Sequence, residues 1–202
     1  TSTPSKNEPL SASVLAFVTG AEEDGPATLW QWDGAARAAR QLASSDQAPA
    51  GWVLPFKNAL SWSKDGQRLF FGLKPSAAKP PAAGKTDEPA SPYDVAAILA
   101  KTEVDVWHWN DPRINAQQKK IWNREKDRTY RAVVHLRDGR VVPLADLDLP
   151  DLETTENPRY ALGLSDVPYR KQTTWGERQR DVYLVSLADG SRKPVTRGLL
   201  DD

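Results

Sequence analysis

The chain has 202 residues, with 27 lysine and arginine residues balanced by 27 aspartate and glutamate residues, and it contains no cysteine or methionine. A chain of this length can bury a core without disulfides or a structural metal. The lack of cysteine excludes a disulfide framework, a thiolate nucleophile and a cysteine-based zinc site. The balanced charge and the lack of any apolar run near the roughly 18 residues of a membrane span predict neither nucleic acid nor membrane as a partner.

Residues 1–12 are polar and contain proline, so we expect a flexible N-terminal tail before the first strand. Because the chain begins with Thr1 and has no methionine, we expect it to be a processed or excised segment of a longer product.

From residue 13 onward, short runs rich in aromatic and β-branched residues alternate with turns, many of them marked by an aspartate–glycine pair. Glycine accepts the positive φ that a tight turn between twisted strands requires, so this pattern predicts β-hairpins. The aspartate–glycine pairs are at 24–25, 33–34, 65–66, 138–139 and 189–190. The predicted strands are 14–18, 28–32, 60–62, 69–73, 104–109, 130–136, 141–144, 160–164, 181–187 and 193–196.

In the run 181–187 both alternating sets of side chains carry apolar groups, which is typical of a strand in a sheet covered on both faces. The runs also repeat loosely in three cycles. We therefore predict an all-β partial β-propeller over residues 13–202, with about three blades that are antiparallel four-stranded sheets. The blades are expected at 13–43, 58–146 and 152–199. On pattern alone, an immunoglobulin-like sandwich is an alternative.

Two insertions interrupt the β pattern. Residues 74–92 are rich in proline, alanine and lysine and predict a mobile surface loop, after which Ser91 and Pro92 could begin a short helix. Residues 111–128 predict a helix that begins near Asp111, with three apolar residues on one face and a charged opposite face. These apolar residues are Ile114, Ile121 and Trp122. We interpret the segment 111–128 as a solvated helix on a blade edge, with a partner-binding helix as the alternative.

No catalytic, cofactor-binding or metal-binding residue is predicted, and no cofactor. The only imidazole bases are His108 and His135, both inside strand-like runs. The stretch Gly163–Val167 approaches a nucleophile elbow but lacks its second glycine. No metal-ligand spacing and no phosphate-binding glycine loop occurs in the sequence. A hydrolase active site within this chain is therefore not expected.

The eight tryptophans include two i, i+2 pairs, Trp30 with Trp32 and Trp107 with Trp109, which place both rings of a pair on one face of a strand. We predict that they pack between blades. A platform for peptides or carbohydrates is the alternative. The remaining tryptophans are Trp52, Trp62, Trp122 and Trp175.

The stretch Leu60–Phe71, which contains Trp62-Ser63-Lys64-Asp65-Gly66, resembles the propeller repeat of TolB-like proteins and of the prolyl oligopeptidase family, where a Trp-Ser-x-Asp-Gly turn joins two blade strands. The order of the later motifs resembles that of the large bacterial members of the family. These motifs are Val104–Asp111, Tyr130–Val134, Val142–Leu144, Arg159–Leu162, Pro168–Tyr169, Asp181–Val185 and Pro194–Thr196.

In that family an N-terminal propeller caps an α/β-hydrolase domain that supplies the catalytic serine, aspartate and histidine. The resemblance implies that this chain is the non-catalytic propeller portion of a serine peptidase. It would limit the access of peptides to a hydrolase domain outside these residues. The implied partners are that C-terminal α/β-hydrolase domain of the same parent chain and the parent's peptide substrates. Because family members are often exported, the resemblance also implies a periplasmic or other extracytoplasmic location.

About three blades cannot close a ring that needs at least about four, so we expect self-association through unpaired blade edges. The alternative function is a stand-alone TolB-like binding or scaffold module with no enzymatic role.

Overall fold

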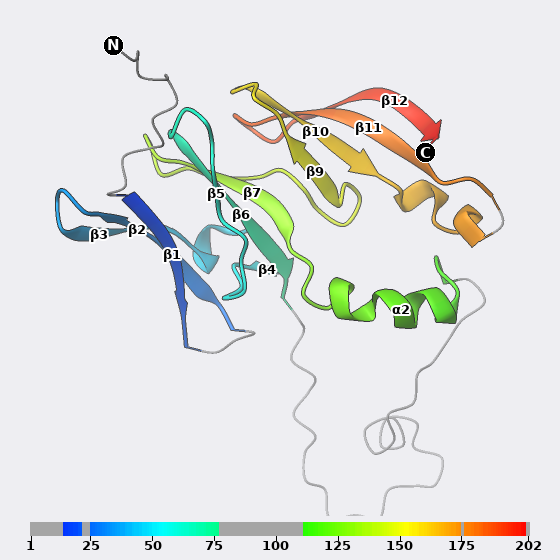
Figure 1. Cartoon of the computed structure of the whole chain (residues 1–202), viewed down its shortest axis with the longest axis horizontal. Coiled ribbons are helices and arrows are strands. Elements are labelled where there is room, and N and C mark those ends of the chain that lie inside the picture. The colour runs from blue at the N-terminus through cyan, green and yellow to red at the C-terminus, as the bar shows by residue number, and fades with distance from the viewer. Residues whose placement is uncertain (1–13, 22–24, 77–110, 175, 201–202) are drawn as a thin grey trace, which may run out of the picture.

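The computed structural model describes residues 14–21, 25–76, 111–174 and 176–200. The strands in these residues form three antiparallel sheets, which follow one another across the view in Figure 1. The first sheet, in the order β1-β2-β3, consists of β1 (Val14–Gly20), β2 (Ala27–Asp33) and β3 (Ala38–Ser44). The third sheet, in the order β12-β11-β10-β9, consists of β9 (Asp151–Thr154), β10 (Tyr160–Ser165), β11 (Gln179–Ser186) and β12 (Arg192–Leu200).

The second sheet lies between these two and contains five strands. They are β4 (Trp52–Val53), β5 (Ser61–Trp62), β6 (Arg68–Pro75), β7 (Tyr130–His135) and β8 (Val141–Pro143). The described helices are α2 (Asn115–Glu125) and the short 3-10 turns η1 (Ser45–Gln47), η2 (Val167–Tyr169) and η3 (Gln172–Thr174). The chain thus has an all-β, partial propeller-like fold, which confirms the predicted fold class.

The third sheet has the four strands predicted for a blade, and the other two sheets differ from four in their described residues. The described sheets have three, five and four strands, and the extra strand of the second sheet arises because β4 and β5 both pair with the same edge of β6. The immunoglobulin-like alternative was wrong. Such a sandwich packs two sheets around one core, whereas here three sheets pack around two cores.

Between β4 and β5, the edge of β6 is completed by a side chain. Asn58 Nδ2 donates to the carbonyl of Gly72 at 2.7 Å, and the N–H of Gly72 donates to Asn58 Oδ1 at 2.6 Å. The amide of Asn58 therefore supplies both hydrogen bonds that a strand residue would supply, and no backbone group of Gly72 is left unpaired. A Cβ on Gly72 would overlap the side chain of Thr129, so this position admits only glycine without rearrangement.

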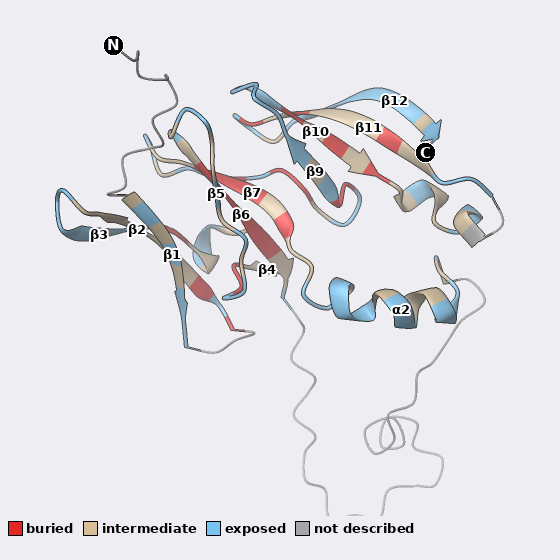
Figure 2. Cartoon of the chain, in the orientation of Figure 1, coloured by how far each residue is buried: buried red, intermediate tan, exposed pale blue. Residues whose placement is uncertain are grey.

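The second sheet is buried on both faces because alternate residues of its strands point in opposite directions. On β6, Leu69 and Phe71 enter the core shared with the first sheet, and Phe70 enters the core shared with the third. On β7, Val134 lies in the core shared with the first sheet and Val133 in the core shared with the third. Figure 2 shows the result as a concentration of buried residues on β6 and β7, with none on α2.

The Trp-Ser-x-Asp-Gly motif forms the turn between β5 and β6. Ser63 Oγ donates to Asp65 Oδ1 at 2.6 Å and accepts the N–H of Arg68 at 3.0 Å, while Asp65 Oδ1 also accepts the N–H of Gln67. Gly66 takes a φ of +65°. The motif residues therefore satisfy the backbone of the turn themselves, which explains why serine, aspartate and glycine occur at this spacing.

Besides the β5–β6 turn, three aspartate–glycine hairpins can be compared in the described residues. Gly139 and Gly190 have φ values of +71° and +75°, as predicted for the turns β7–β8 and β11–β12. In the β2–β3 turn the positive φ of 50° belongs to Arg37 instead of Gly34. There Asp33 Oδ1 accepts the backbone N–H groups of Ala35 and Ala36, and the positive φ comes three residues after the glycine.

The predicted loop 74–92 begins too early. Lys74 and Pro75 belong to β6, where they pair with Val53 and Trp52 of β4. The helix in 111–128 is confirmed as α2, but it begins at Asn115 and not at Asp111. Several predictions lie outside the described residues, namely the tail 1–12, the rest of the loop, the helix after Ser91, the strand 104–109 with His108 and its two tryptophans, and Trp175.

Candidate functional site

A cavity of about 770 Å³ lies between α2 and the third sheet, and we call it the α2 cavity. Its wall combines one face of α2 and the residues just before it, the edge strand β9, the end of β10, η3 and the start of β11. The lining residues are Arg113, Gln117, Lys120, Ile121, Arg124, Asp151, Leu152, Glu153, Leu164, Ser165, Asp166, Thr173, Arg178, Gln179 and Arg180.

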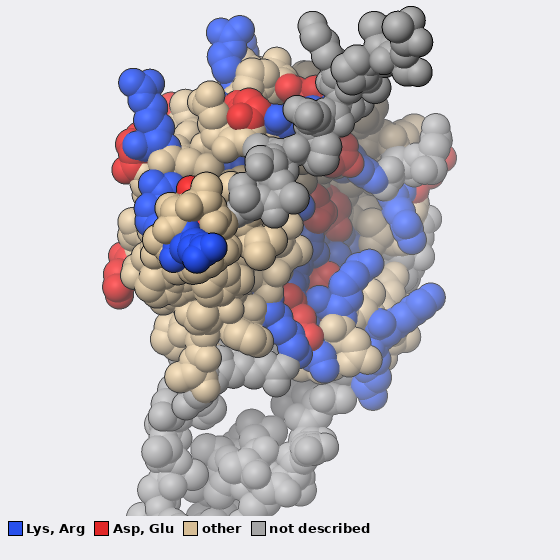
Figure 3. All heavy atoms as spheres, turned by 60° about the vertical axis from the view of Figure 1, so that its left-hand side comes forward, with Lys and Arg blue, Asp and Glu red and all other residues tan. Residues whose placement is uncertain are grey.

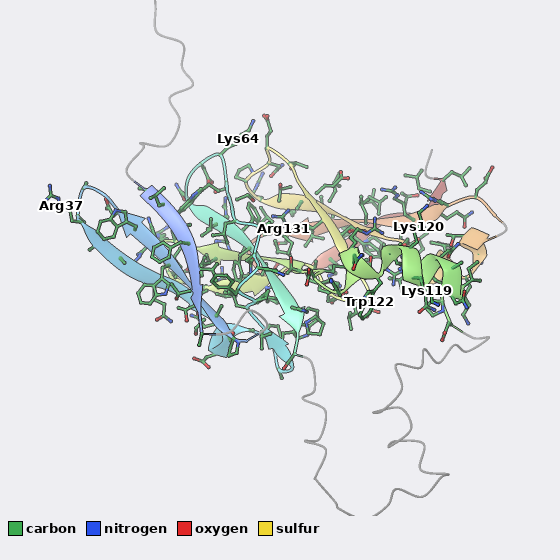
Figure 4. The ribbon with its side chains drawn as sticks, turned by 60° about the horizontal axis from the view of Figure 1, so that its bottom comes forward. Arg37, Lys64, Lys119, Lys120, Trp122 and Arg131 are labelled. Atoms are coloured by element: carbon green, nitrogen blue, oxygen red, sulfur yellow. The ribbon has the colours of Figure 1, made fainter. Side chains whose placement is uncertain are left out.

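The helix wall follows from spacing along α2. The residues that line the cavity recur every three or four positions, so they share one helical face. Figure 4 shows Lys120 on the side of the helix toward the third sheet, with Lys119 and Trp122 on the opposite side. Trp122 is 63% exposed, and no residue of the helix is buried. Of the three apolar residues predicted to share a helical face, Ile114 is exposed as well and only Ile121 lies in the cavity wall, so the side of the helix toward the sheet is mainly polar.

Two acidic groups of the cavity wall are neutralised by arginines. Asp166 is paired with Arg170 at 2.8 Å and with Arg113 at 3.3 Å. Burial alone would raise the pKa of Asp166, but the hydrogen bond and charge of Arg170 and the charge of Arg113 outweigh it and lower that pKa. Asp151 accepts a hydrogen bond from Arg128 at 2.6 Å. Both carboxylates thus hold arginines in place at the cavity wall.

The remaining charges of the wall are predominantly positive. Lys120 and Arg178 make no hydrogen bond or ion pair with another described residue, and Arg124 contacts Glu125 only at 3.7 Å on an exposed side chain. Glu153 is the one further acidic residue of the described lining. The cavity therefore has an excess of positive charge available to a bound anion.

Apolar side chains line the same cavity. Ile121 comes from α2, Leu152 from β9 and Leu164 from β10. Leu152 also packs against the core between the second and third sheets, which holds this part of the wall in place. The wall thus combines these three apolar side chains with eight charged ones, and the volume is within the range of sites for small ligands.

Ser165 borders the α2 cavity but lacks the surroundings of a nucleophile. It is buried, its Oγ donates to the carbonyl of Asp148 at 2.5 Å, and it accepts the N–H of Val167. His135 lies elsewhere, with Nε2 2.9 Å from the carbonyl oxygen of Leu187. Because a carbonyl oxygen only accepts, that nitrogen carries the proton and ties the second sheet to the third. These two residues are structural, and they do not form a catalytic pair.

The outer face of the first sheet carries a cluster of large apolar side chains. Leu15 is paired across the strands with Trp32, and Phe17 with Trp30, so all four point to the same face. Leu15 is 61% exposed and Phe17 39%, whereas the alternating residue Leu29 is fully buried toward the second sheet. Figure 3 brings this side of the molecule forward and shows a broad area of uncharged atoms. Trp30 and Trp32 therefore do not fill the space between the described sheets, contrary to our prediction, although Trp52 and Trp62 do pack against the first core.

The outer face of the third sheet is apolar only on its two central strands, because Leu162 is also paired with Glu153 of β9 and Leu184 with Lys193 of β12. Val185 and Leu187 are buried toward the second sheet, as the alternation in 181–187 predicts. On the opposite face Leu162 is paired with Leu184, and both are half-buried. In the described part of the chain, the stack of sheets thus ends in a broad apolar face on the first sheet and in a narrower apolar strip on the third.

No known family model matches this chain, and no curated protein sequence matches it. Among the described residues, no helix is long and apolar enough to cross a membrane. No group of three or more histidine, aspartate or glutamate side chains in the described part of the chain could hold a metal ion.

Proposed function

We propose that this chain is the non-catalytic propeller portion of a prolyl oligopeptidase-like serine peptidase, in which it limits the access of peptides to a hydrolase domain outside these residues. The observation that carries the proposal is the stack of three antiparallel sheets, with an apolar outer face on the first and an apolar central strip on the outer face of the third. A propeller is built by packing blades face to face, so apolar side chains on both outer faces are what an inner section of such a stack would present.

The order of the sequence motifs supports the same proposal. The Trp-Ser-x-Asp-Gly motif forms the β5–β6 turn, which is the position that the family resemblance assigns to it. A propeller role also agrees with the structural roles of Ser165 and His135, since a propeller contributes shape and not a nucleophile.

The decisive experiment isolates the native product from the source cells with an antibody raised against this chain. We expect a product several times larger than 22.4 kDa that a fluorophosphonate probe labels, because a serine hydrolase domain carries an activated serine. The isolated 202-residue chain is the control and should stay unlabelled. A larger product that the probe does not label would contradict the hydrolase.

The role in limiting access is tested on the same native product. We expect it to cleave a short chromogenic peptide and to leave a long peptide with the same cleavage sequence intact, because only peptides small enough to pass the propeller reach the hydrolase domain. Equal rates on the two peptides would contradict this role while leaving the peptidase itself in place.

A second candidate function is a stand-alone TolB-like binding module. The observation that favours it is the α2 cavity, which is built entirely from this chain. A native product of 22.4 kDa, the mass of this chain, would support this alternative and overturn the first proposal.

A further inference from the structure

We infer that the α2 cavity binds a short peptide that bears a free carboxylate, with the peptide extended along the edge of β9. This inference goes beyond the proposed function because it needs only residues of this chain and no hydrolase domain.

The charges of the wall favour an anion. Asp166 and Asp151 are already paired with arginines of the protein, so they repel a bound carboxylate less than unpaired carboxylates would. Lys120 lines the cavity from α2 and Arg178 from the segment just before β11, and neither is paired within the described residues. A guanidinium group matches the two oxygens of a carboxylate, and an ammonium group adds a point charge beside it.

The apolar part of the wall indicates that the anion has an apolar body. Ile121, Leu152 and Leu164 would contact the side chains of a peptide but offer nothing to a hydrated inorganic ion. The volume of about 770 Å³ is within the usual range for ligands of a few residues. Inorganic phosphate is thus a poorer match than a peptide carboxylate.

The backbone of β9 indicates that the body is a peptide. Among the described strands β9 pairs only with β10, so its other edge presents backbone N–H and C=O groups without a strand partner. Three consecutive residues of this edge strand, 151–153, belong to the cavity wall. An extended peptide can add to such an edge through main-chain hydrogen bonds, while pockets select its side chains and charge.

The test is isothermal titration calorimetry of the 202-residue chain at low salt with N-acetyl-leucyl-leucine, whose C-terminal carboxylate is free. We expect this peptide to bind and its C-terminal amide to bind at least about tenfold more weakly, because the amide loses a charge-assisted contact. Methylation of both amide nitrogens should also weaken binding, since it removes the donors that pair with β9. No binding by the free acid, or equal binding by acid and amide, would overturn the inference. Undiminished binding of the methylated peptide would contradict its placement along β9.

The chain offers a matched pair of variants on α2. Lys120→Glu reverses a charge of the cavity wall, and Lys119→Glu makes the same change one residue earlier on the other side of the helix. Both lysines are exposed, so both variants should fold, as circular dichroism would verify. We expect Lys120→Glu to weaken binding at least about tenfold and Lys119→Glu to change it less than about twofold. Equal losses would show general electrostatic attraction and overturn the site.

Inorganic phosphate serves as the competitor that separates a peptide site from a simple anion site. We expect phosphate at the concentration of the peptide to leave peptide binding unchanged, because it gains nothing from the apolar wall. Displacement by phosphate as effective as that by unlabelled peptide would overturn the assignment to a peptide. These outcomes are independent of the size and labelling of the native product, so this inference and the proposed function can fail separately.

Discussion

The packing of the third sheet against the second can be tested at one glycine of the β11–β12 turn. A Cβ added to Gly190 would lie 2.6 Å from the carbonyl oxygen of Pro143 and 3.3 Å from Val142 Cγ1, both on β8. Gly139 in the β7–β8 turn has nearly the same φ, +71° against +75°, but a Cβ there would meet nothing within 4 Å. The two glycines therefore differ in steric contact and share the backbone conformation.

Gly139→Ala should cost about 1 kcal/mol of unfolding free energy, because an L-residue at positive φ is disfavoured by about 1–2 kcal/mol and the unfolded chain of the alanine variant has less entropy to gain. Gly190→Ala adds the cost of forcing a methyl group against backbone, typically about 1–3 kcal/mol, so we expect about 2–4 kcal/mol in total. Urea unfolding followed by tryptophan fluorescence and far-UV circular dichroism measures both values. Equal losses in the two variants would refute the close contact between the turn and β8.

Three further predictions concern the second sheet and its neighbours. Asn58→Ala should lower the unfolding free energy by about 1–3 kcal/mol in the same urea assay, because both backbone groups of Gly72 lose their partner, and a neutral result would contradict this role. Phe71→Ala should cost about 3–5 kcal/mol, whereas Phe56→Ala at a 45% exposed position should cost much less, and similar losses would show that the first core is misplaced. Burial alone would raise the pKa of Asp146, but the hydrogen bonds and charge of Arg192 and two backbone N–H groups lower it below the ordinary 3.8. The stability that ionised Asp146 contributes is complete above that ordinary value and is lost as pH falls through the lower folded value. Asp146→Asn should therefore reduce the fall in thermal midpoint below about pH 4. An unchanged fall would argue against the ion pair.

The strands that could be predicted from sequence are those whose own residues favour extended backbone. The runs that became β1, β2, β6, β7, β10 and β11 are rich in β-branched, aromatic and leucine residues. β3 was missed because its sequence, Ala-Ala-Arg-Gln-Leu-Ala-Ser, consists of residues that favour helices, and it is a strand here because it pairs with β2. β9 was missed for a similar reason, since its acidic sequence Asp-Leu-Glu-Thr is held extended by β10.

The α2 cavity could be predicted only in part. The spacing of Arg113, Gln117, Lys120 and Arg124 on one helical face is visible in the sequence, but apolar residues are the usual guide to the packed face of a helix. Here they mislead, because Ile114 and Trp122 are exposed. Which wall lies opposite a polar helical face depends on strands far away in the chain, and a single sequence does not carry that information.

The surface of this chain separates two kinds of contact that should respond to different variants. The outer face of the first sheet is apolar and carries Leu15 and Phe17, whereas the α2 cavity at the other end of the stack gathers Lys120 and Arg178. Burial of the apolar face is a hydrophobic process that salt does not weaken, while an anion in the cavity is bound by charges that salt screens. If the apolar face packs against a further sheet, Leu15→Lys should disturb the native product and leave peptide binding by this chain unchanged. Lys120→Glu should do the reverse, because each residue acts at only one of these surfaces.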